Sequence, residues 1–140
     1  MYPLLLDTHS YLRYFILILL LIVIIRSLLG LINKTPFKRI EVKIALFLLI
    51  CTHTQLIVGL ILYFVSPAVQ FGPDTMTTYR YWTVEHIFAM LVAIGLITAG
   101  WSTTKRATTD AAKFKKLFIF NTLALVIIVA MIIMSGRGLW

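Results

Sequence analysis

Four long stretches of the 140-residue chain consist almost entirely of apolar side chains. Each is about as long as the roughly 20 residues that a helix needs to cross the hydrocarbon core of a bilayer. The chain is 61% hydrophobic and 13% charged, with a mean hydropathy of +0.98. That composition excludes an ordinary soluble domain. The sequence therefore predicts an all-α integral membrane protein, with helices expected over residues 4–32, 42–65, 82–104 and 114–135.

The connections between the apolar stretches are short, so each helix is expected to run antiparallel to the next. Four crossings and their loops use the whole chain and leave no room for a separate soluble domain. The predicted architecture is thus one four-helix up-down bundle that spans residues 1–140.

The cations predict how this bundle is oriented. Lysine and arginine concentrate in cytoplasmic loops of membrane proteins. Here most of them lie in the first and third loops, at Lys34, Lys38, Arg39 and Lys43 and at Lys105, Arg106, Lys113, Lys115 and Lys116. Both termini are therefore expected outside the cytoplasm of a multi-pass protein of the bacterial inner membrane. The net charge of +8 is accounted for by this orientation, so the expected partner is the lipid bilayer and not nucleic acid.

Three histidines carry the chemistry that the sequence offers. His9, His53 and His86 each lie on a different apolar stretch. Ionisable groups at membrane depth are energetically costly, and they typically serve a proton, an ion, a metal or a redox cofactor. Three such residues on three helices favour a functional site over three unrelated hydrogen bonds.

The depth of each histidine shows which of them can meet. With a rise of about 1.5 Å per residue, His9 lies about 10 Å inward from Tyr2, and His86 lies about 6–10 Å inward from the aromatic residues that precede it. His53 lies about 15 Å inward from Tyr63. The first and third helices of an up-down bundle are diagonal to each other. We therefore expect His9 and His86 to face each other at one level, with His53 deeper.

A planar cofactor fits between two such imidazoles. Two histidines that fill both axial positions of a haem b favour electron transfer over oxygen chemistry. We expect His9 and His86 to be the ligands, and the alternative pair is His53 with His86. In the first case His53 and Gln55 are candidates for a quinone or proton site. Arg13 and Arg80 are candidates to bind the haem propionates.

Three strings carry a resemblance to a known group: HSYLRYF from His9, HTQLIVGLILYFVSP from His53, and WTVEH up to His86. They resemble small bacterial four-helix membrane proteins of the cytochrome B group, over nearly the whole chain. The second string is also similar to helices of cytochrome b561 and haem A synthase. The resemblance implies haem b and electron transport in a respiratory chain. Because a b561 bundle needs four ligands for two haems, three histidines allow at most one bis-histidine haem here.

Two other functions remain open from the sequence. One is a non-haem copper, zinc or iron site that uses all three histidines and Glu85. The other is a cofactor-free structural subunit of a membrane complex, in which polar side chains only link helices. An independent enzyme is less expected than an electron-transfer protein or subunit, because the chain has no recognisable nucleophile with a base and no nucleotide-binding motif.

Overall fold

The computed structural model describes residues 2–72 and 84–135, and these residues form four helices. They are α1 (Tyr2–Asn33), α2 (Arg39–Val65), α4 (His86–Arg106) and α5 (Asp110–Met134). Each is long and apolar enough to cross a membrane. The predicted all-α fold with four helices of spanning length is therefore confirmed. The expected start of the third helix, at residue 82, lies outside the described residues.

Local signals explain several helix ends. Lys34 has a positive φ of 53° directly after α1, a conformation that breaks the helix. Ser66 is extended after α2, with φ −76° and ψ 133°, because it precedes Pro67. Thr109 caps α5, since its hydroxyl oxygen accepts a hydrogen bond of 3.1 Å from the backbone N–H of Ala112.

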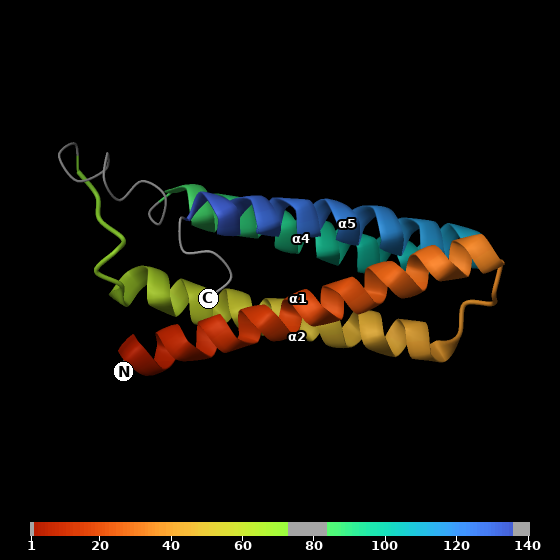
Figure 1. Ribbon diagram of the computed structural model, residues 1–140, viewed down its shortest axis with the longest axis horizontal. Coiled ribbons are helices and arrows are strands. Elements are labelled where there is room, and N and C mark those ends of the chain that lie inside the picture. The colour runs from red at the N-terminus through yellow and green to blue at the C-terminus, as the bar shows by residue number, and fades with distance from the viewer. Residues whose placement is uncertain (1, 73–83, 136–140) are drawn as a thin grey trace.

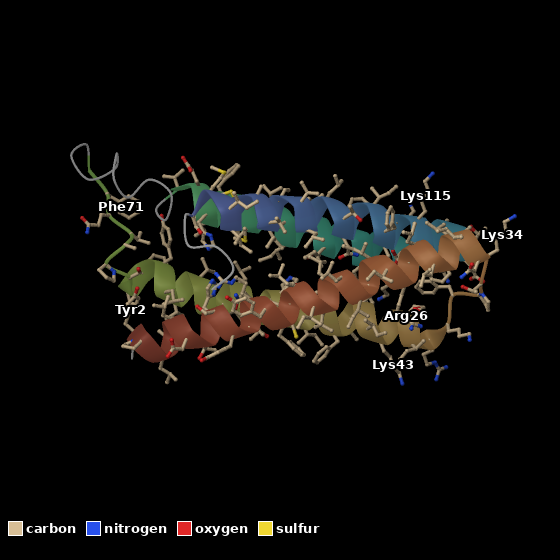
Figure 2. The ribbon with its side chains drawn as sticks, viewed as in Figure 1. Tyr2, Arg26, Lys34, Lys43, Phe71 and Lys115 are labelled. Carbon is tan, nitrogen blue, oxygen red and sulfur yellow. The ribbon has the colours of Figure 1, made fainter. Side chains whose placement is uncertain are left out.

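The four helices lie side by side in an up-down arrangement (Figure 1). α1 packs against α2 and α5, and α4 packs against α5 and α2. α1 and α4 are therefore diagonal to each other in the bundle. Lys34 and Lys115 lie at one end of the bundle and Tyr2 lies at the other (Figure 2), so the first and third connections share an end.

The core is concentrated in the half of the bundle near Asn33. In α1, residues 2–15 include no buried residue, and burial begins at Ile16. Leu20 and Leu48 are fully buried in the same core cluster. The α1–α2 pair and the α4–α5 pair diverge toward the end that holds Tyr2 (Figure 1).

Large apolar side chains also cover the outer surface of the bundle. On α2 they include Ile57, which is 61% exposed, and Phe64, which is 82% exposed. A surface of this kind is costly in water and is compatible with contact to lipid. The structure is thus that of a candidate multi-pass membrane protein.

Candidate functional site

A cavity of about 180 Å³ lies between the helices in the half of the bundle near Tyr2. All four helices contribute to its walls. Most of the lining is apolar, but a group of polar side chains shares it: His9, Ser10 and Arg13 from α1, Thr52 and Gln55 from α2, and His86 from α4. A largely apolar cavity with a few converging polar groups is typical of a ligand site.

His9 and His86 meet across this cavity. Their ring centroids are 6.3 Å apart, and the ring planes are inclined at 70°. Both side chains are half-buried. Because α1 and α4 are diagonal, the two imidazoles approach each other from opposite sides of the bundle.

Two residues of α2 hold His9 in place. Gln55 Nε2 donates a hydrogen bond of 2.8 Å to the backbone carbonyl oxygen of His9. One turn further along, Gly59 lies against the His9 ring, where an added Cβ would be 3.2 Å from Cε1 and 3.7 Å from Nδ1. A larger residue at position 59 would therefore have to displace the imidazole. The amide and the missing side chain together fix the position of His9.

Two buried polar atoms at this site have no hydrogen-bond partner among residues 2–72 and 84–135. They are Nδ1 of His9 and Oε1 of Gln55. A buried polar atom without a partner costs about 1–3 kcal/mol. Oδ1 of Asn121 and Oγ1 of Thr104, which do not line the cavity, have no partner among these residues either. The two atoms at this site differ in that they lie beside a cavity that has room for a ligand.

Arg13 brings positive charge to the same cavity, one helical turn from His9. Its Nη2 donates a hydrogen bond of 3.2 Å to the hydroxyl oxygen of Tyr14, and its guanidinium carbon lies 4.9 Å from the Tyr14 ring centroid. The charge is therefore held beside the histidine pair. Arg80, the other expected propionate partner, lies outside the described residues.

His53 does not join the other two histidines. Its side chain is exposed, and its Nδ1 lies 2.8 Å from the backbone oxygen of Leu49. Residues two positions apart on a helix point about 200° from each other, so His53 points outward while Gln55 points into the cavity. The structure forms neither the alternative pair of His53 with His86 nor a shared site of His53 and Gln55.

The described residues also do not form the expected non-haem metal site. Within residues 2–72 and 84–135, no three histidine, cysteine or carboxylate side chains are grouped closely enough to hold a metal ion. The reason is the outward direction of His53, which removes one of the three expected ligands.

The other polar side chains in the membrane-length helices bond mainly within their own helix. Thr52 and Thr54 donate to the carbonyl oxygens of Leu49 and Ile50, and Asn121 donates to that of Leu117. Gln55 is different because its bond crosses from α2 to α1. Linking helices therefore does not explain why most of these polar residues are present.

An ion pair that the sequence pattern did not predict joins α1 to α2 at the other end of the bundle. Arg26 Nε donates to both carboxylate oxygens of Glu41, at 3.0 and 3.1 Å, and Arg26 Nη2 also contacts that carboxylate. The available signal was the placement of opposite charges on either side of one short loop. This pair is far from the histidines and fixes the helix ends.

Comparisons with protein-family models, with curated proteins and with solved structures find no match. The resemblance to cytochrome B proteins therefore stays an expectation from the sequence. The chemistry of the site has to follow from its geometry.

Proposed function

We propose that this chain is a b-type cytochrome of the bacterial inner membrane and that it carries electrons through one haem bound by His9 and His86. The observation that supports this most is the approach of these two imidazoles across a cavity, from diagonal helices. The proposal includes an orientation with both termini outside the cytoplasm, because the cationic loops share one end of the bundle.

The separation of the two rings fits a metal held between them. For imidazoles on opposite sides of one ion, the centroid distance is twice the sum of a metal–nitrogen bond of about 2 Å and a ring radius of about 1 Å, or about 6 Å. The observed 6.3 Å agrees with that value. The same distance also lies within the 4.5–7 Å range of edge-to-face ring pairs, so the support comes from the distance together with the cavity between the two helices.

The cavity walls also suit a flat apolar ligand. Most of the lining is apolar, and Met90 and Met131 contribute flexible thioethers from α4 and α5. The present volume of about 180 Å³ is smaller than typical ligand sites of 300–1,000 Å³. Methionine side chains adapt readily to irregular space, so we expect these two to move when the cavity fills.

The chain's own residues would define what such a haem can do. Haem iron supplies reversible one-electron reduction. His9 and His86 would both hold the iron, a ligand set that favours electron transfer over oxygen chemistry, and the apolar walls would exclude water. Arg13 offers a counter-charge for a propionate, and Arg80 is a second candidate from the sequence. Electron carriage within a respiratory chain, in contact with other subunits, is the activity that these properties favour.

A visible spectrum of the purified protein tests the proposal. The reduced-minus-oxidised spectrum should show a b-type band, with about one haem per chain. His9→Leu and His86→Leu should each remove the low-spin b-type band of a bis-histidine haem, because each variant takes away one of the two imidazoles that would hold the iron. His53→Leu is the matched control and should retain it. A protein without porphyrin, or a band that survives both ligand variants, would overturn the proposal.

A further inference from the structure

His53 is a polar residue on the apolar outer face of α2. Its helical neighbours on this face, one turn away on either side, are Ile50 and Ile57, which are 54% and 61% exposed. His53 follows Arg39 by 14 positions and precedes Val65 by 12, about 21 and 18 Å along the axis. In a bilayer this imidazole would lie near the middle of the hydrocarbon layer and face outward.

The hydrogen bond to Leu49 determines which ring nitrogen can bind a ligand. A carbonyl oxygen only accepts hydrogen bonds, so His53 Nδ1 must carry the proton that it donates over 2.8 Å. Neutral imidazole has a single N–H, and a charged ring is costly in hydrocarbon. The outward Nε2 of His53 is therefore a hydrogen-bond acceptor, and lipid tails offer it no donor.

The shape of this face argues against a second helix as the donor. Close helix contacts in membranes use glycine, alanine, serine or threonine, which let two backbones approach. The exposed residues above and below His53 are large, namely Leu46, Ile50, Ile57 and Phe64. A second copy of this chain would also bring one Nε2 acceptor against another. A small lipid-soluble molecule with a hydroxyl group fits the same face without these problems.

We propose that His53 is the hydrogen-bond acceptor of a quinol-binding site on the outer face of α2. The quinol hydroxyl donates to Nε2 of His53, and its ring lies against Ile50 and Ile57. The hydroxyl group distinguishes quinols from the lipid tails around them. This inference rests on the proposed function, because a lipid-soluble electron carrier is relevant to a protein that exchanges electrons.

Photolabelling of the full chain in lipid nanodiscs tests the site directly. The probe is decylubiquinol with a diazirine on its tail, kept reduced during illumination, and labelled peptides are identified by mass spectrometry. We expect label within α2 near His53. Unlabelled decylubiquinol should compete, whereas its dimethyl ether, which has no hydroxyl donor, should compete about two- to tenfold less well.

Variants separate the hydrogen bond from general contact with the face. His53→Leu should weaken labelling about two- to tenfold, because it keeps a similar volume but removes the acceptor. Thr54→Val is the control and should label normally, since the Thr54 hydroxyl already donates its hydrogen bond to the backbone oxygen of Ile50. Equal labelling of His53→Leu and the unmodified chain, or equal competition by the dimethyl ether, would overturn the site.

The same samples distinguish this inference from the haem proposal. The b-type band should persist in His53→Leu, so loss of labelling with an intact band supports the quinol site. If the purified protein contains no porphyrin but is still labelled in a way that depends on His53, the haem proposal is wrong and the quinol site is supported. Crosslinks between two copies through α2 in place of quinol labelling would reject the small ligand.

Discussion

The half of the bundle near Asn33 and the half near Tyr2 consist of the same four helices, but they pack differently. Near Asn33, Leu20, Leu48 and Leu117 are buried in one core cluster, and Gly30 lies directly beneath the ring of Phe114. Near Tyr2 the helix pairs diverge around a cavity that contains His9 and His86.

This contrast separates stability from ligand binding. Lipid tails are as apolar as a protein core, so tight packing stabilises a membrane bundle more than burial of apolar surface does. The half near Asn33 provides that packing. The half near Tyr2 keeps the cavity, beside which Nδ1 of His9 and Oε1 of Gln55 have no partner among the described residues. The packed half therefore allows the other half to remain open.

The comparison between the two halves is tested most strongly by truncating one leucine in each. We expect the largest change in the free energy of unfolding from these variants. Leu48→Ala should lower the free energy of unfolding by about 2–5 kcal/mol, because it opens a void in a close-packed region. Leu56→Ala, on the same helix but lining the cavity, should cost about half as much or less, since the removed atoms border existing space. Unfolding by SDS in mixed micelles measures both, and equal costs would contradict the contrast.

Two glycines give a smaller and more local test. In Gly30→Ala the new Cβ would be 2.5 Å from Cζ of Phe114. That ring is itself packed against Phe37, with centroids 5.0 Å apart, so we expect a loss of about 1–3 kcal/mol. Gly95→Ala meets nothing within 4 Å and should be neutral or stabilising by up to about 1 kcal/mol. The same SDS titration compares them, and similar losses at both positions would be evidence against close packing at Gly30.

The smallest effect is expected at Gln55. Gln55→Leu removes the hydrogen bond to the His9 backbone, which is worth about 0.6 kcal/mol by the average for such bonds in membrane proteins. The effect of Gln55→Leu on the histidine site should be clearer, because His9 then keeps only one of its two contacts with α2, the packing against Gly59. We expect a shifted haem midpoint potential in Gln55→Leu and an unchanged one in Thr54→Val. Identical potentials would show that Gln55 does not position His9.

The sequence predicted the helices well because length and apolar composition are strong signals for membrane-spanning helices. It also placed His9 and His86 at similar depths, since depth needs only the rise per residue and the aromatic residues near the ends. These are one-dimensional properties of each helix.

The direction of His53 could not be predicted in the same way. A soluble helix reveals its buried face by a periodic pattern of polar and apolar residues, but α2 is apolar on its outer side and on its core-facing side alike. The contacts of Gln55 and Gly59 with His9 depend on how α1 and α2 align, which no single-helix pattern contains. The Arg26–Glu41 pair depends on the same alignment.

The position of His9 along α1 has a consequence for energy conversion. Asn33 follows His9 by 24 positions, an axial rise of about 36 Å. The haem proposed at His9 would thus be separated from the cationic end by most of the bilayer. Moving one charge through a membrane potential of 100 mV changes its free energy by about 2.3 kcal/mol. An electron that enters and leaves near His9 moves across little of that potential, so turnover there would be nearly independent of membrane voltage.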